Sequence, residues 1–195
     1  NVDVYMGQFK CPAVMSGASP EDSLLMIDRT RMGQLFDAWQ PGVAVTGDFG
    51  AIHLKLAAQN GADGAGDELG IVARAEFQVG EGAKHREGAY GARDFDANIG
   101  IGYFEDSSEA AGVEFGSAVI LDAYATLNAF SFQGEVLDMD EEFSAKMVGN
   151  TSMDEATPYA ATFGFMFVPD RWEAALRYQD LDNDLNTTIL GGGVN

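Results

Sequence analysis

The chain has 195 residues, of which 46% are hydrophobic, and its 31 acidic and 11 basic side chains give it a net charge of -20. This acidity excludes a nucleic acid as the main partner, because a phosphate backbone needs a cationic surface. The sequence contains no run of 18 apolar residues, so no transmembrane helix is expected.

A period-two alternation of apolar and polar side chains restarts many times along the chain. In residues 171–179, Trp172 and Tyr178 fall on one face, whereas Glu173 and Arg177 fall on the other. A strand directs successive side chains to opposite faces, so the pattern predicts antiparallel strands with one apolar and one polar face. In chain order, strands are expected at residues 2–9, 42–49, 51–59, 68–79, 95–104, 118–127, 130–138, 158–168, 171–180 and 187–195.

The connections between these segments alternate between short and long. Tight turns are expected at residues 50, 128–129 and 169–170, on one rim of the sheet. The gaps expected on the other rim are longer, at residues 10–41, 60–67, 105–117, 139–157 and 181–186. Short turns at one rim and long loops at the other are typical of outer-membrane barrels. The Gly-rich segment 80–94 does not fit, because it is long but falls on the short-turn rim, and we interpret it as a tolerated insertion.

The connection at residues 10–41 is too long for a hairpin turn. Ser19 and Pro20, followed by two acidic residues, predict the start of a short helix. Long loops are often functional, and in a barrel a loop of this kind can fold into the lumen. We therefore expect 10–41 to be a constriction loop, with charges at Arg29, Arg31 and Asp28.

The polar faces of the expected strands carry charges of both signs. If the apolar faces point outward to lipid, these charges line a watery lumen. The pore-lining residues would then be Lys55, Arg74, Arg177, His53, Asp48, Glu76, Asp122, Glu135 and Glu173. A mixed wall in an acidic chain does not favour anions, and rings of acidic residues favour cations. The charge selectivity is therefore left open.

No motif in the sequence indicates catalysis or a cofactor. His53 and His85 lie in different segments without a cysteine partner, so no metal site is expected. No G-x-S-x-G nucleophile elbow is present. Residues 180–186 place oxygen ligands at alternate positions, as calcium loops do, but Gly191 stands where the bidentate glutamate would be. A solvated hairpin loop is the preferred interpretation, and calcium binding by the acidic loops is left open.

Residues 4–12, Val-Tyr-Met-Gly-Gln-Phe-Lys-Cys-Pro, resemble the strand-ending VGQFKxP signature of the phosphate-selective porin family, of the porin O and porin P type. Segments 26–30, 41–45, 56–61, 169–182 and 190–195 resemble later parts of the same family. The resemblance implies an all-β, antiparallel transmembrane β-barrel in the bacterial outer membrane. It also implies that 1–195 is a partial barrel domain with about ten of about sixteen strands, and that the protein is a homotrimer in contact with lipid and lipopolysaccharide.

The sequence thus predicts a porin through which small hydrophilic solutes or ions, including anions such as phosphate, diffuse passively. The alternative is a structural outer-membrane barrel that anchors a surface layer or a partner complex. A third interpretation is a soluble β-sandwich that buries its apolar faces and binds a ligand. An enzyme is not expected, because no catalytic constellation is present.

Overall fold

The structure is a computed structural model that describes residues 1–61, 68–80, 87–90, 94–110, 113–148 and 154–195. In this part of the chain ten strands form one antiparallel sheet, and each strand pairs with its neighbours in sequence. The strands are β1 (Val2–Lys10), β2 (Trp39–Phe49), β3 (Ile52–Asn60), β4 (Leu69–Val79), β5 (Asp96–Ala110), β6 (Val113–Leu127), β7 (Phe130–Met139), β8 (Tyr159–Val168), β9 (Trp172–Asp180) and β10 (Thr188–Val194). The expected all-β antiparallel fold is confirmed.

The helices are short. They are α1 (Met15–Ala18), the 3-10 turn η1 (Glu21–Ser23), α2 (Arg31–Leu35) and α3 (Glu141–Met147). Within the described ranges, no helix has the length and hydropathy needed to cross a bilayer. β1 and β10 are the two edges of the sheet and do not pair with each other in the described chain.

Two expected boundaries differ from the structure. Most of the gap expected at 105–117 is strand, because β5 continues to Ala110 and β6 begins at Val113, with a bulge between Asp106 and Glu109. The run of Asp, Ser and Glu residues there gave no strand signal, since polar residues on both faces show no period of two. The long loop is also shorter than expected, because Lys10 ends β1 and Trp39 begins β2.

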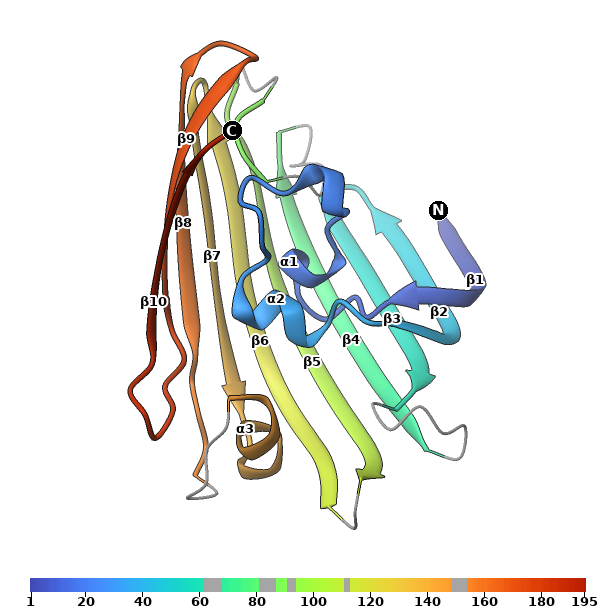
Figure 1. Cartoon of the computed structure of the whole chain (residues 1–195). Coiled ribbons are helices and arrows are strands. Elements are labelled where there is room, and N and C mark those ends of the chain that lie inside the picture. The colour runs from blue at the N-terminus through green and yellow to red at the C-terminus, as the bar shows by residue number, and fades with distance from the viewer. Residues whose placement is uncertain (62–67, 81–86, 91–93, 111–112, 149–153) are drawn as a thin grey trace.

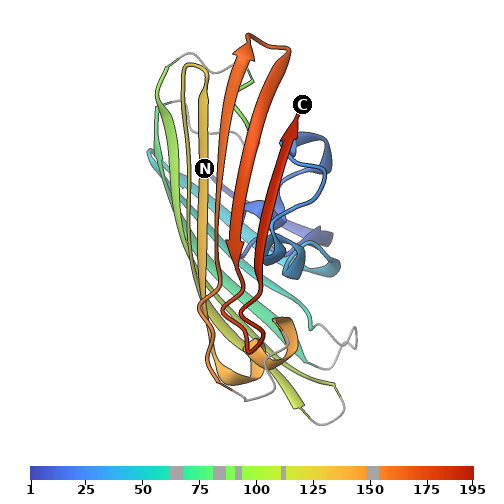
Figure 2. The same cartoon turned by 60° about the vertical axis from the view of Figure 1, so that its left-hand side comes forward.

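The two faces of the sheet are covered differently. The segment between β1 and β2, residues 11–38, folds back over one face, and the sheet curves around it (Figures 1 and 2). We call residues 11–38 the inner segment and this side the inner face. The opposite, outer face carries large apolar side chains that remain about half exposed, among them Ile101, Leu121 and Phe163. The alternation predicted from the sequence is therefore present, and the polar residues lie on the covered side.

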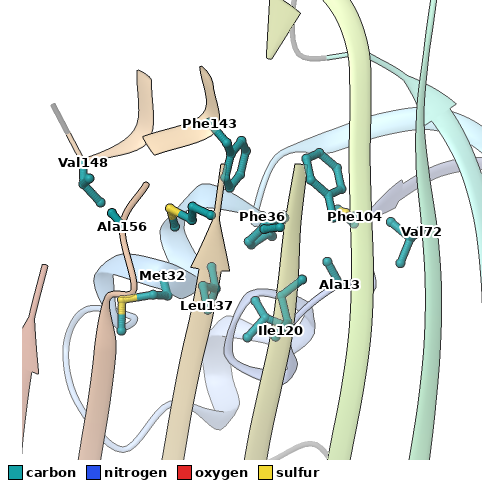
Figure 3. Close-up of a cluster of buried hydrophobic side chains, with 14 of the residues drawn as sticks. Ala13, Met32, Phe36, Val72, Phe104, Ile120, Leu137, Phe143, Val148 and Ala156 are labelled. Atoms are coloured by element: carbon teal, nitrogen blue, oxygen red, sulfur yellow. The ribbon is translucent and has the colours of Figure 1, made fainter. Parts of the chain in front are cut away.

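An apolar cluster holds the inner segment and α3 against the sheet. Phe36, at the end of α2, packs against Phe104 of β5 and Phe143 of α3, with ring centroids 5.1 and 5.9 Å apart. Ile120 and Leu137 of the sheet are fully buried beneath these rings (Figure 3). Burial of aromatic and aliphatic side chains is the main favourable term in folding. The cluster therefore ties three separate parts of the chain together near the rim of the long connections.

Candidate functional site

The inner face gathers charged side chains from three strands. Arg74 and Glu76 come from β4, Lys55 from β3 and Asp122 from β6. Glu76 Oε1 lies 2.7 Å from Arg74 Nε and 2.8 Å from Lys55 Nζ. Arg74 Nη2 lies 2.7 Å from Asp122 Oδ1. These four residues, all expected on the polar faces, form one ion-pair network in which Arg74, Glu76 and Asp122 are no more than 4% exposed.

The inner segment is bonded to this network through its backbone. Arg74 Nη1 donates a hydrogen bond to the carbonyl oxygen of Ala13 at 2.9 Å. The amide of Met15 donates to Asp122 Oδ2, also at 2.9 Å. Hydrogen bonds to charged groups are the stronger kind. Arg74 and Asp122 of the sheet therefore face the interior and also hold the inner segment in place.

Arg29 is buried where the inner segment meets β7. Its Nη1 donates to the carbonyl oxygen of Ser16 at 2.6 Å, and its Nε lies 3.6 Å from Asp37 Oδ2. The Ser16 hydroxyl in turn donates to Glu135 Oε2 at 2.6 Å. Arg29 Nη2 has no hydrogen-bond partner within the described residues. Of the three residues expected to form the constriction, Arg29 is thus a buried anchor with one unused donor.

Arg31 and Asp28 lie on the exposed side of the inner segment. The Arg31 amide donates to Gln179 Oε1 at 2.6 Å, and its Nη1 donates to Gln34 Oε1 at 3.0 Å. The carbonyl oxygen of Asp28 accepts a 2.6 Å hydrogen bond from Arg177 Nη1. The exposed charges of the segment therefore lie next to β9.

Arg177 of β9 has an acidic partner that the sequence analysis missed. Its Nη2 lies 3.2 Å from Glu87 Oε2, and its Nε donates to the hydroxyl of Thr162 at 2.9 Å. Glu87 lies in the segment 80–94, which we interpreted as a tolerated insertion. The acidic residues of this Gly-rich stretch show no periodic pattern, so only the position of the stretch on the short-turn rim could have indicated a role.

Residues next to Glu87 also contact the inner face. The Ala89 amide donates to both carboxylate oxygens of Glu173, at 3.0 and 2.9 Å, and the Ser131 hydroxyl donates to Glu173 Oε1 at 2.9 Å. The Tyr124 hydroxyl donates to the carbonyl oxygen of Gly88. Described residues 87–90 therefore enter the interior from the rim opposite the long connections.

His53 and Asp48 are separate from these clusters. They pair with each other near the short turn that joins β2 to β3, and their side chains are 28% and 50% exposed. The pair is therefore a feature of the rim.

A groove of about 790 Å³ lies between the inner segment and the last two strands. Arg29, Arg31, Asp28 and Arg177 line it, together with Gln179 and the glycines of β10. All three constriction-loop residues and one wall residue are therefore brought to the same open space. Charged and amide side chains reach the groove from both the inner segment and β9, beside apolar residues such as Met26 and Ile189. The groove could accept a hydrated solute.

The described residues contain no cluster of three or more His, Cys, Asp or Glu side chains that could hold a metal ion. In the hairpin between β9 and β10, Asp182 Oδ2 accepts the Thr157 amide at 2.7 Å and Asn183 Oδ1 accepts the Thr187 amide at 2.9 Å. These oxygens thus stabilise the turn.

No protein-family model matches the chain, and the comparisons with curated proteins and with solved structures found no significant match. The fold defines an all-β class, an antiparallel sheet of ten strands in the described residues. Its outer face is apolar, and its charged inner face is partly covered by the inner segment.

Proposed function

We propose that the ten strands belong to a transmembrane β-barrel porin of the bacterial outer membrane, through which small hydrophilic solutes or ions diffuse passively. One observation supports this most strongly. Large apolar side chains occupy the uncovered outer face of the sheet, whereas the charged side chains lie on the covered inner face. This distribution is the reverse of that in a soluble protein, where apolar side chains are buried and charged ones are exposed. It suits the wall of a barrel between lipid and water.

The ends of the outer face are aromatic. Tyr159 and Tyr178 pack together toward the rim of the long connections, with ring centroids 6.0 Å apart. Phe130 and Phe165 pack at 4.9 Å toward the other rim, where Trp172 begins β9. Aromatic girdles flank the apolar band of membrane barrels. The ring pairs support the membrane proposal because they lie at both ends of the apolar surface.

The strand length also supports the proposal. β8 has 10 residues, which at about 3.3 Å per residue extend roughly 33 Å along the strand. With the tilt of about 40° that barrel strands adopt, the height is roughly 25 Å, the same as the apolar band of known membrane barrels.

The inner segment and the groove beside it suggest how the proposed channel works. The inner segment occupies part of the interior, and the groove of about 790 Å³ lies open beside it. Permeation would depend on the size of this groove and on the charges of Arg31, Asp28 and Arg177. Phosphate as a permeant anion, a trimeric assembly and contact with lipopolysaccharide belong to the same proposal and derive from the family resemblance.

Planar-bilayer recording tests this function. The full chain, purified in detergent and added to one side of a lipid bilayer, should produce discrete conductance steps, and a sample of detergent alone should not. A monodisperse protein that needs no detergent and produces no steps would contradict the proposal and favour a soluble fold.

A second candidate is a structural outer-membrane barrel that anchors a surface layer or a partner complex. The burial of Arg74, Glu76 and Asp122 beneath the inner segment favours it, because charges packed in this way do not contact passing ions. A protein that inserts into vesicles, as judged by protection from added protease, but never conducts would support this second function.

A further inference from the structure

Two segments from opposite rims meet inside the sheet. The inner segment enters between β1 and β2, and residues 87–90 enter between β4 and β5. The Glu87 amide donates to the carbonyl oxygen of Ser23 at 2.8 Å, and the Leu25 amide donates to Glu87 Oε2 at 3.0 Å. Glu87 is therefore bonded to the inner segment through both its backbone and its side chain.

The same carboxylate is the charged partner of Arg177. Glu87 Oε2 lies 3.2 Å from Arg177 Nη2, and the two residues are 6% and 3% exposed. Arg177 also donates to the hydroxyl of Thr162 and to the carbonyl oxygen of Asp28, which are both neutral. Glu87 thus supplies the negative charge that compensates this buried arginine.

The pair lies between two open spaces. Arg177 lines the groove of about 790 Å³, and Glu87 lines a smaller cavity of about 180 Å³. Leu24, Leu25 and Asn195 line both, so the two spaces are neighbours. A change in the net charge of the Glu87–Arg177 pair therefore changes the electrostatic potential in both spaces.

The groove already has a positive side. Arg29 and Arg31 line it, and Arg29 Nη2 has no hydrogen-bond partner within the described part of the chain. Without Glu87, Arg177 would add an uncompensated positive charge to this side of the groove, next to Asp28. The charge balance of the groove consequently depends on an acidic residue that comes from another loop.

We propose that Glu87 is a selectivity-determining residue. Its carboxylate cancels the charge of Arg177 at the boundary between the groove and the smaller cavity, and so limits the preference of the channel for anions. This inference rests on the proposed channel function. The ligands concerned are small inorganic anions and cations that pass through the groove.

The test is the reversal potential under a potassium chloride gradient at low ionic strength, where charges are least screened. Replacement of Glu87 by Gln keeps the shape and an acceptor for the Leu25 amide but removes the charge. The ratio of chloride to potassium permeability should rise by roughly threefold or more, as expected for one unit charge within several ångströms of an ion. Arg177→Gln should move the ratio in the opposite direction.

The double variant Glu87→Gln with Arg177→Gln separates charge from structure. Because it restores electrical balance, its permeability ratio should return toward that of the native chain. If a loss of packing alone changed the ratio, both single variants would move it in the same direction and the double variant would move it at least as far. Glu155→Gln is the matched control, since this exposed residue changes the net charge by the same amount but does not line either space.

The outcomes distinguish the two proposals. Every variant could produce conductance steps while the native chain and Glu87→Gln have equal reversal potentials. This result would overturn the role of Glu87 but not the channel function. A native chain without conductance steps would overturn the channel function and the role of Glu87 with it. A rise in chloride permeability for Glu87→Gln that Glu155→Gln does not reproduce would establish the assignment.

Discussion

The guanidinium of Arg74 and the carboxylate of Asp122 lie 2.7 Å apart although their strands, β4 and β6, are not neighbours. The ion pair crosses β5, where Gly100 is in register with Asp122 and Gly102 with Arg74. Neither glycine has a side chain to separate the charges. The network on the inner face thus depends on glycines as much as on the charged residues themselves.

Gly100→Ala should destabilise the protein. A Cβ at this position would contact Arg74 Nη2 and Asp122 Oδ1 directly, so the buried ion pair would have to separate. We expect the free energy of unfolding to fall by about 2 kcal/mol or more, because a broken buried pair leaves uncompensated charges. A guanidinium titration followed by the fluorescence of Trp39 and Trp172 measures the change.

Gly70→Ala is the matched control for this substitution. The nearest atom to a Cβ at Gly70 is 3.7 Å away, an ordinary van der Waals contact. Its unfolding midpoint should stay close to that of the native chain. Equal midpoints for Gly100→Ala and Gly70→Ala would show that the ion pair across β5 contributes little.

Asp122→Ala should release the inner segment. The substitution leaves the Met15 amide without its acceptor and Arg74 without one of its two carboxylate partners. Trypsin cleavage after Arg31, which is exposed in the folded chain, should accelerate roughly tenfold or more, because cleavage follows the population of the open form. Trypsin should cleave the Asp3→Ala variant, which is changed at an exposed position of β1, at the same rate as the native chain. Equal rates for both variants would mean that other contacts hold the segment.

Cys11 should be unreactive in the folded protein. Burial raises the pKa of its thiol from the ordinary 9.0 to about 12, and the thiolate is the reactive form. At about pH 8 iodoacetamide should label the folded chain roughly a thousandfold more slowly than the unfolded chain. Mass spectrometry measures this directly, since Cys11 is the only cysteine. Rapid labelling under native conditions would mean that the inner segment opens readily.

The same thiol should make stability depend on pH in alkaline solution. Between pH 9.0 and about 12 the unfolded chain loses the Cys11 proton, whereas the folded chain keeps it. The folded state then binds more protons, so the free energy of unfolding contributed by this group falls as the pH rises. The contribution is fully present below pH 9.0. Cys11→Ala should have a shallower alkaline decline, and parallel declines would contradict the shifted pKa.

Leu121→Arg tests the environment of the outer face. Leu121 is 49% exposed on β6. If this face contacts lipid, a central arginine should cost about 2–4 kcal/mol of stability in the inserted state. If the face contacts water, the substitution should be nearly neutral and should improve solubility. Leu185→Arg, at an 81% exposed position between β9 and β10, is the control and should have little effect when folding into lipid vesicles is measured.

Much of the architecture was predictable from local patterns. The alternation in residues 171–179 identified β9 and assigned Glu173 and Arg177 to its polar face, and similar patterns located the other strands. Prediction was weaker where the pattern is absent. Where β5 ends and β6 begins, the sequence shows no regular alternation of polar and apolar residues. The pairing of residues 106–110 with residues 113–116 could therefore not be predicted from residue types.

The sequence by itself therefore determined most of the strands, their order along the chain and which of their side chains share a face, because a period of two is a local property of the backbone. Only the tertiary structure decided the partners of those side chains. The pairing of Arg74 with Asp122 depends on strand register across β5, and the pairing of Glu87 with Arg177 depends on a segment without periodicity that folds inward. Contacts between residues far apart in sequence follow from packing in three dimensions, which no single stretch of residues specifies.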